Sequence, residues 1–317
     1  MRIALALAAA LALAAPAHAA QTDPKLTLLQ TRDRQLFAAG WRLASANAPF
    51  CHRAAPKLGL QILDAAGFDD ASGVRKQLGL SGDLAVGAVA PGSPAQLAGI
   101  AQNNTLVALN GDNLASRFPP SDPGWQRLID VTAALDAAAS HGQAVTLSVA
   151  SPGQSAREVV IAPTLSCPTR FEVLDKGGRA SAEGTRVMFG RDFVGFGYAE
   201  DEFAAAVAHE LAHNLLGHRA TLDDKGRSLG NVRTTEREAD RLMPWLLANA
   251  GYDPEAALRF MNRWGPRNDG GLLRNRNHEG WDERAEWIAI ELKRIAPLMA
   301  NEGHADWARH FIREKLD

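Results

Sequence analysis

Apolar residues near the start of the chain recur at the spacing of an α-helix. The apolar positions of residues 23–47 include four leucines, namely Leu26, Leu29, Leu36 and Leu43. Positions three and four apart lie on one face of a helix, so this spacing is typical of a helix that buries one side. The pattern predicts an N-terminal amphipathic helix within residues 20–56.

Beyond residue 56 the pattern changes to short apolar runs separated by turn-forming residues. The candidate strands are residues 58–63, 84–89, 105–111, 144–149 and 158–162, and a helix is expected near residues 125–140. Short strands bounded by Gly, Pro and Asn are typical of small β-rich domains. We therefore expect residues 57–165 to form a β-rich domain.

The last part of the chain, residues 168–317, returns to helical spacing after a strand, a turn and a second strand near residues 179–189. One helix is predicted from its stripe of large apolar residues, which are Phe203, Val207, Leu211 and Leu215. Five tryptophans fall on or beside the expected helices and are interpreted as core packing: Trp245, Trp264, Trp281, Trp287 and Trp307. The whole pattern predicts an α+β, multidomain protein.

The helix with the apolar stripe also carries a motif with specific chemistry. Residues 209–213 read HExxH, so His209 and His213 lie one turn apart and both imidazoles can bind one metal ion. Glu210 lies beside them and can accept a proton from water at the metal. The motif predicts zinc-assisted peptide hydrolysis. The alternative is a globular protein that contains the five letters by chance and binds no metal.

A catalytic zinc site needs a third protein ligand. One class of zinc peptidase supplies it as the last histidine of HExxHxxGxxH. Here Gly217 comes one place late, Arg219 stands at the histidine position, and His218 is one residue short. That class is therefore excluded, and the ligand must come from elsewhere in the chain.

Residues 234–240 offer the ligand of a second class, which takes a Glu from a later helix. Thr234 or Thr235 can cap this helix, and Glu236 and Asp240 then lie one turn apart on one face. Glu236 is expected to bind zinc, and Asp240 is expected to orient a ligand histidine from behind. On spacing alone, a charged helix start at the protein surface explains the segment equally well.

Together these motifs resemble the HtpX/BepA-like gluzincin peptidases, family forty-eight of the metallopeptidases. The resemblance rests on HExxH at 209–213, ExEAD at 236–240 and Gly-Tyr-Asp-Pro at 251–254, and it covers roughly residues 170–293. It implies a mainly helical zincin domain that binds one zinc ion. It also implies that a strand within residues 179–189 borders the cleft and pairs with an extended substrate.

The resemblance also implies roles for individual residues. It makes Glu236, and not Glu238, the third zinc ligand. A family segment His-Pro-x-x-x-x-Arg matches at His278 and Arg284, with Glu279 in place of the proline. It places His278 near the zinc as a catalytic residue and Arg284 behind the ligands. The alternative for His278 is a loop histidine before a helix.

The β-rich part resembles a PDZ domain of the bacterial HtrA kind. The matches are residues 58–60, 93–100 and 109–111, the resemblance covers about residues 57–163, and Asn-Asn at 103–104 departs from the usual Gly-Asp. The resemblance implies that backbone N–H groups bind the C-terminal carboxylate of a peptide. The residues involved would be Leu58, Gly59 and Leu60. The alternative is a PDZ-shaped spacer that binds nothing.

The first residues and the cysteines indicate export. A positive start, a short apolar run and an A-x-A sequence predict a signal peptide over residues 1–19, cleaved near Ala19. No other apolar run approaches membrane length, so we expect the mature chain to lack a transmembrane segment and to be periplasmic or secreted. Only Cys51 and Cys167 remain in it, and in an oxidising compartment they are expected to pair.

The composition is that of a globular protein, with 46% hydrophobic residues and a net charge of −2. No basic block indicates a nucleic-acid partner. We interpret the chain as an exported zinc endopeptidase that acts on proteins or peptides in envelope protein quality control. A PDZ-like domain would bind substrate or regulate access. The alternative is a PDZ-type peptide-binding or chaperone-like assembly factor with a latent peptidase domain.

Overall fold

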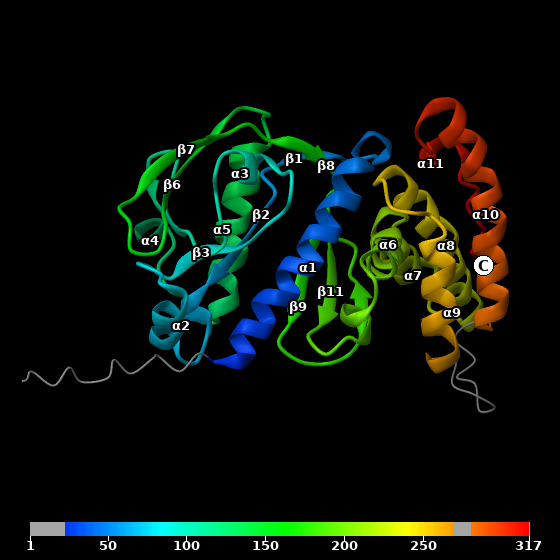
Figure 1. Ribbon diagram of the computed structural model, residues 1–317, viewed down its shortest axis with the longest axis horizontal. Coiled ribbons are helices and arrows are strands. Elements are labelled where there is room, and N and C mark those ends of the chain that lie inside the picture. Colours follow the sequence, from blue (N-terminus) through cyan, green and yellow to red (C-terminus); the bar gives the residue numbers. More distant parts are fainter. Residues whose placement is uncertain (1–22, 269–279, 317) are drawn as a thin grey trace, which may run out of the picture.

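The computed structural model describes residues 23–268 and 280–316 as mixed α and β structure (Figure 1). A β-rich unit, residues 55–166, and a helical unit, which begins at residue 170, lie on either side of the long N-terminal helix. The α+β class predicted from the sequence is confirmed. No helix within the described part of the chain is both long and apolar enough to cross a membrane.

Helix α1 (Pro24–Ala46) lies between the two units and packs against both. Asp23 caps it by accepting a backbone N–H in its first turn. Leu26 is buried against the β-rich unit, whereas Leu36 and Leu43 belong to the core of the helical unit. The apolar stripe of this helix therefore joins two separate cores.

The β-rich unit is an antiparallel sheet with one long helix. Its strands pair in the order β2–β3–β4–β6–β7, with β5 beside β4. They are β2 (Leu60–Asp64), β3 (Leu84–Val89), β4 (Thr105–Leu109), β5 (Asp112–Asn113), β6 (Val145–Ala150) and β7 (Arg157–Ile161). The helices are η2 (Ala65–Gly67), α2 (Ala71–Leu78), α3 (Pro94–Leu97), α4 (Leu114–Arg117) and α5 (Gly124–Ala139). Val131 and Leu135 of α5 share one core with buried strand residues such as Val86 and Leu147.

A disulfide and two short strands close the β-rich unit where the chain enters and leaves it. After η1 (Ala48–Phe50), β1 (Ala55–Lys57) pairs with β8 (Thr164–Ser166). The predicted bridge between Cys51 and Cys167 is confirmed, with the two Cα atoms 5.7 Å apart and a sequence separation of 116. Closing a loop of this length stabilises a fold by up to about 4–5 kcal/mol in the chain-entropy model.

The helical unit combines a small sheet with six helices in the described residues. In the sheet, β11 (Arg186–Gly190) lies between β10 (Ala180–Ala182) and β9 (Arg170–Leu174), antiparallel to the first and parallel to the second. After η3 (Val194–Gly197) come α6 (Glu200–Leu215), α7 (His218–Lys225), α8 (Leu229–Asn249), α9 (Ala256–Asn268), α10 (Trp281–Glu302) and α11 (Trp307–His310). Phe203, Val207 and Leu211 of the predicted stripe are fully buried.

Helix α8 begins earlier than the sequence indicated. We predicted a cap at Thr234 or Thr235, and this is wrong, because Ser228 caps the helix and Thr235 donates to the carbonyl of Val232 within it. An upstream serine able to accept the free N–H groups of the first turn lets the helix start there. Glu236 therefore lies inside an established helix and not in its first turn, which makes its position more rigid.

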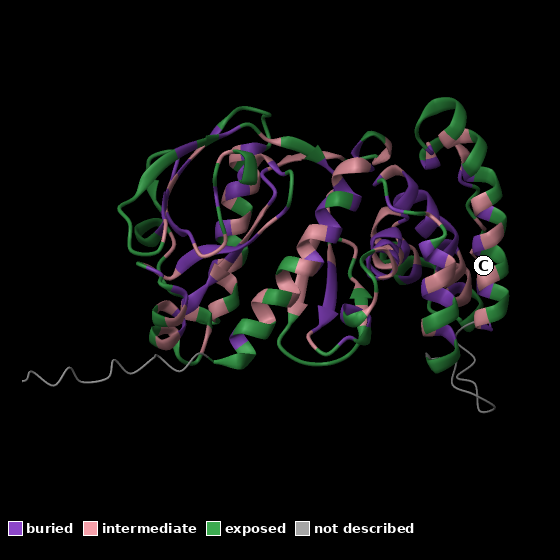
Figure 2. Cartoon of the chain, viewed as in Figure 1, coloured by how far each residue is buried: buried purple, intermediate pink, exposed green. Residues whose placement is uncertain are grey.

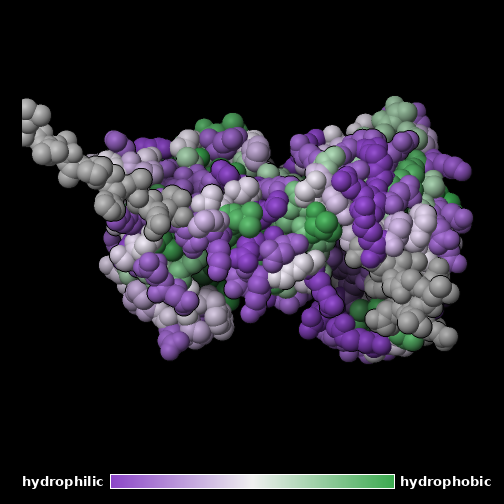
Figure 3. All heavy atoms as spheres, turned by 60° about the horizontal axis from the view of Figure 1, so that its bottom comes forward, coloured by the Kyte–Doolittle hydropathy of each residue, from purple (hydrophilic) through white to green (hydrophobic). Residues whose placement is uncertain are grey.

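Buried residues concentrate along α6 and α8, and the outer faces of α1 and α10 are exposed (Figure 2). In the space-filling view of Figure 3, hydrophilic residues cover most of the surface and hydrophobic residues form separate patches. The predicted signal peptide, residues 1–19, and the predicted catalytic residue His278 lie outside the described residues.

Candidate metal centre

Helix α6 places two histidines at one point in a cleft of the helical unit. The apolar side of this helix is buried, which fixes its rotation and turns His209 and His213 towards the cleft. Their Nε2 atoms are 3.2 Å apart. The side chains are only 13% and 14% exposed, so both imidazoles are held by their surroundings.

Helix α8 brings a carboxylate to the same point. The Oε2 atom of Glu236 lies 3.5 Å from His209 Nε2, and its Oε1 atom lies 3.6 Å from His213 Nε2. One ligand atom from each residue lies within 4.8 Å of the others. A tetrahedral zinc ion with bonds of about 2.0–2.2 Å sets its ligand atoms about 3.3–3.6 Å apart. The spacing of the three ligand atoms therefore matches what one zinc ion requires of its protein ligands.

Asp240 lies behind His209, and Arg284, which also lines the cleft, holds Asp240 in place. Asp240 Oδ1 is 3.0 Å from His209 Nδ1, and Arg284 donates to both carboxylate oxygens of Asp240, from Nη2 to Oδ1 at 2.8 Å and from Nε to Oδ2 at 2.5 Å. Burial alone would raise the pKa of Asp240, but Arg284 and His209 hold it below its usual range. An ionised carboxylate accepts the Nδ1–H of His209 and so leaves Nε2 as the ring atom that would bind a metal in place of a proton.

His218 and Glu238 lie behind His213. The sequence excluded His218 as a ligand, and the structure places it outside the three-residue cluster, with its Nδ1 atom 2.9 Å from His213 Nδ1. Its Nε2 atom lies 3.1 Å from Glu238 Oε2. Sequence reasoning missed this contact. The only signal was Gly217, whose φ of +69° turns the chain back so that His218 starts a new helix beside the old one.

The cluster attracts positive charge: burial opposes protonation of His209, but Asp240 and Glu236 raise its pKa to about 10. Burial lowers the pKa of His213, which keeps its imidazole neutral as a metal ligand must be. Burial opposes ionisation of Glu236, but the two histidines lower its pKa below the usual range. Burial, assisted by Glu236 and opposed by His209, raises the pKa of Glu210 to about 7. Glu210 is thus poised to exchange a proton near neutral pH.

The cleft around these residues has a volume of about 680 Å³. One wall is strand β10, which pairs only with β11 among the described strands and forms an edge of the sheet. Aromatic residues of α9 and α10 form part of the opposite wall, including Phe260, Trp264 and Trp281. The cleft therefore combines a strand edge, apolar walls and the cluster of ligands.

The tryptophans correct one interpretation of the sequence. Trp245 and Trp307 are buried as core residues, as expected. Trp264 and Trp281 also pack against the core but line the cleft as well, and Trp287 is 39% exposed. Periodicity identified the helices that carry these residues but not the opening between them, because the opening depends on how α9 and α10 pack.

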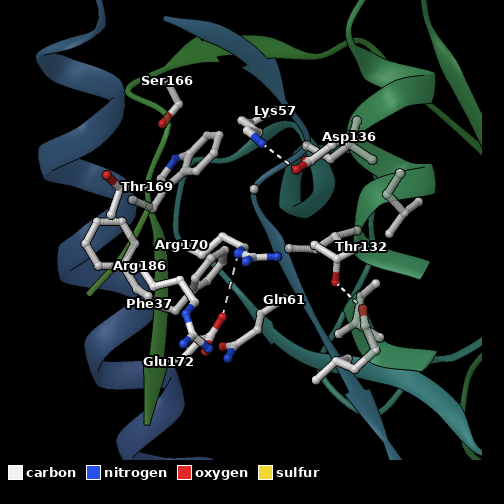
Figure 4. A pocket seen from close by; sticks show the side chains of 18 of the residues that line it. Phe37, Lys57, Gln61, Thr132, Asp136, Ser166, Thr169, Arg170, Glu172 and Arg186 are labelled. Atoms are coloured by element: carbon white, nitrogen blue, oxygen red, sulfur yellow. Dashed lines mark hydrogen bonds and ion pairs between the residues drawn. The ribbon is translucent and has the colours of Figure 1, made fainter. Parts of the chain in front are cut away.

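A second hollow, the apolar groove, lies between the β-rich unit, α1 and the small sheet (Figure 4). It has a volume of about 270 Å³ and is lined by residues 57–62, by α5, by Phe37 and Trp41 of α1, and by residues 169–172. Lys57 and Asp136 form an ion pair of 2.7 Å at its edge. The groove is therefore apolar within and charged at the rim.

The residues singled out by the PDZ resemblance line this groove. Leu58, Gly59 and Leu60 form part of its wall beside the edge strand β2. Gly59 has φ +76°, and a Cβ atom there would lie 2.2 Å from the Cβ atom of Ser93. Only glycine fits this position. The opposite wall, which includes Phe171, was not predicted, because it comes from the other unit.

Comparison of the chain with models of protein families, with curated proteins and with solved structures gave no match. A functional conclusion therefore has to come from the geometry and chemistry of the chain's own residues.

Proposed function

We propose that the protein is a zinc-dependent endopeptidase that hydrolyses peptide bonds in protein substrates. The observation that carries the proposal is the convergence of His209, His213 and Glu236 at tetrahedral spacing. Glu210 lines the same cleft with a pKa of about 7. A charged helix start at the surface does not explain this arrangement, because Glu236 is mostly buried beside both histidines.

The residues divide the chemistry between them. Held by His209, His213 and Glu236, a zinc ion supplies a Lewis acid that acidifies water and polarises a carbonyl group. Glu210 accepts the proton of the attacking water and later delivers it to the leaving amine. Asp240 keeps His209 oriented throughout, since its carboxylate is itself held by Arg284. His278 lies outside the described residues, and the catalytic role that the resemblance implies for it stays a prediction.

The edge strand β10 provides the way in which a substrate binds. An extended peptide can pair with the outer edge of β10 through backbone hydrogen bonds, which depend little on sequence. The aromatic wall formed by Phe260 and Trp264 contacts alternate side chains of such a peptide. This mode of binding favours unfolded protein segments as substrates, because most backbone groups of a folded domain already form hydrogen bonds within it.

The test is to measure bound zinc in the mature chain, residues 20–317, and in single variants. We expect about one zinc ion per chain in the wild type and a loss of at least about 100-fold in affinity in His213→Ala and Glu236→Ala. His304→Ala is the control, because this histidine is exposed and lies outside the cluster. Zinc binding that does not depend on Glu236 would contradict the proposal.

We also propose that the apolar groove binds the C-terminal end of a peptide. Strand β2 pairs with β3 on one side only, and its other edge has no partner strand in the described residues. The loop before this strand bends at Gly59. A strand edge next to a bent loop is the arrangement in which PDZ domains bind an extended peptide with a free carboxylate. In this role the β-rich unit delivers substrate to the cleft or controls access to it, or acts as a peptide-binding assembly factor on its own.

The disulfide supports export to the periplasm or the exterior of the cell. Cys51 and Cys167 account for all the cysteines of the chain, and the structure joins them. Such bridges persist in oxidising compartments and are rare in a reducing cytosol. We therefore place the mature protein outside the cytoplasm.

A further inference from the structure

Behind the three candidate ligands lies a row of buried, hydrogen-bonded polar groups that the mechanism above does not use. It runs from His213 to His218, with the two Nδ1 atoms 2.9 Å apart, and from His218 to Glu238 over 3.1 Å. His218 is 1% exposed, and the side chain of Glu238 is fully buried. Buried groups at such distances hold their partners in one geometry, because breaking any contact leaves a polar atom unsatisfied.

In this row of polar groups, the donor and the acceptor of each hydrogen bond are determined by Glu238. An ionised Glu238 only accepts hydrogen bonds, so His218 must donate through Nε2–H. A neutral His218 then has an unprotonated Nδ1 atom, which can only accept. The proton between the two rings therefore lies on Nδ1 of His213. That tautomer leaves the Nε2 lone pair of His213 facing His209 and Glu236, as zinc binding requires.

We propose that His218 and Glu238 are positioning residues that hold His213 in its metal-binding tautomer and orientation. The inference rests on the proposed zinc site and deepens it. Glu238 acts on His213 through His218, whereas Asp240 acts on His209 directly. The two ligand histidines thus depend on two different carboxylates, one of them two contacts away from the metal.

The C-terminal segment keeps Glu238 ionised. Arg313 donates to both carboxylate oxygens, at 2.7 and 3.1 Å, and the backbone N–H of Glu314 donates to Oε1 at 2.7 Å. These three hydrogen bonds satisfy both oxygens of the buried carboxylate in its ionised form. The last residues of the chain are therefore part of the support of the metal site, although they lie outside the cleft.

The donors around Glu238 limit how a glutamine at this position can orient its amide group. The substitution Glu238→Gln is therefore informative. If the amide nitrogen of the new side chain took the Oε1 position, it would face two fixed donors, one of them a backbone N–H. The Oε2 position faces only one fixed donor, Arg313 Nη2, beside the ring of His218, so the amide nitrogen takes that position and donates to His218 Nε2. His218 is then protonated at Nδ1, and His213 must carry its proton on Nε2 or lose the contact. Either outcome weakens its bond to zinc.

The experiment compares Glu238→Gln with Glu291→Gln in the full mature chain. Glu291 is an equally buried carboxylate in the same unit, bound by Arg241 at 2.7 Å and by Trp245 Nε1 at 3.1 Å. None of these bonds involves a histidine. Glu291→Gln therefore measures the cost of replacing a buried glutamate without disturbing the ligand histidines. Zinc affinity is measured by competition with a chromophoric chelator, and folding is monitored by circular dichroism.

We expect Glu238→Gln to lower zinc affinity by about 10- to 100-fold, the usual effect of losing a partner behind a metal ligand. Glu291→Gln should change it less than about threefold, because its bonds do not reach the metal ligands. The ring ¹⁵N resonances of His218 provide a second readout. They should show the Nε2–H tautomer in the wild type and the Nδ1–H tautomer in Glu238→Gln. A structural role alone would not reverse a tautomer.

The outcomes separate this inference from the proposed function. Equal zinc affinities in the two glutamine variants, or an Nδ1–H tautomer of His218 in the wild type, would overturn the positioning role and leave the zinc site intact. A wild-type protein that binds no zinc would overturn both. Zinc binding that falls only in Glu238→Gln, together with the reversed tautomer, would support both.

Discussion

The two hollows of the molecule are built in opposite ways. In the metal cleft, charged and polar side chains from α6 and α8 meet at one point, and a buried carboxylate stands behind each histidine. In the apolar groove, the central features are a strand edge, a bend at Gly59 and hydrophobic walls, while the charges pair at the rim. One site depends on side-chain chemistry and the other on backbone shape.

This difference determines how each site responds to substitution. A ligand or catalytic side chain supplies an atom that no other residue replaces at that point, so its loss removes a function outright. A groove wall supplies contact area that is shared among many residues, so the loss of one side chain weakens binding by degrees. Variants of the two sites should therefore differ in the size of their effects and should not affect each other's ligand.

The largest expected effect is that of Glu210→Gln on peptide hydrolysis. The amide cannot accept a proton, so turnover of a fluorescence-quenched unfolded protein should fall by at least about 10³-fold. Zinc content should remain that of the wild type, because Glu210 is not part of the ligand cluster. Glu286→Gln, an exposed glutamate of α10, is the control. Residual cleavage above about 1% of the wild-type rate would assign the proton transfer to another residue.

The convergence of the candidate ligands and Asp240 in one cluster could be predicted in part from the sequence, because each pair of residues lies within one helix. His209 and His213 are four positions apart, and so are Glu236 and Asp240, and helix geometry places such pairs on one face. The link between His213 and His218 could not be predicted. It crosses from the last turn of α6 to the first residue of α7 and depends on the reversal at Gly217.

The apolar groove shows more clearly what sequence periodicity cannot predict. Alternation and turn residues indicated the strands, and β3 forms over residues 84–89 where it was expected. The groove itself needs Phe37 from α1 and Arg170 from β9, which are separated by more than a hundred residues in sequence. No periodic pattern encodes such a contact, because it results from the packing of two units across α1.

Beside the apolar groove, α1 contacts both units through Asp33. Like the carboxylates of the metal cleft, Asp33 is largely shielded from solvent and has a shifted pKa. It lies on α1, accepts the backbone N–H of Val173 on β9 at 3.2 Å and contacts Gln61 of β2. Burial raises the pKa of Asp33 to about 6. The folded state therefore holds a proton that the unfolded state, with a pKa near 3.8, has already released between about pH 4 and 6.

The sign of the linkage follows from these two pKa values. Stability should fall as pH rises from about 4 to 6, and the cost of ionising Asp33 should be complete above that range, at about 3 kcal/mol or less. Asp33→Asn should therefore stabilise the protein at about pH 8 and have little effect at about pH 4. Denaturant unfolding at both pH values measures this. An equal difference between variant and wild type at the two pH values would contradict the raised pKa.

The smallest expected effect tests the groove itself. Trp125 lines the groove and is 60% exposed, so Trp125→Ala removes contact area with little cost to the fold. The affinity for decapeptides with a free carboxylate and an apolar last residue should fall by about tenfold, with zinc affinity unchanged. Val160→Ala, at a site 64% exposed on β7 and outside the groove, is the control. If the groove binds a free carboxylate as proposed, amidated peptides should bind more weakly than free acids. Equal binding by acids and amides would mean that the groove holds peptides by their apolar side chains alone, and the contrast between a site of shape and a site of charge would then be sharper still.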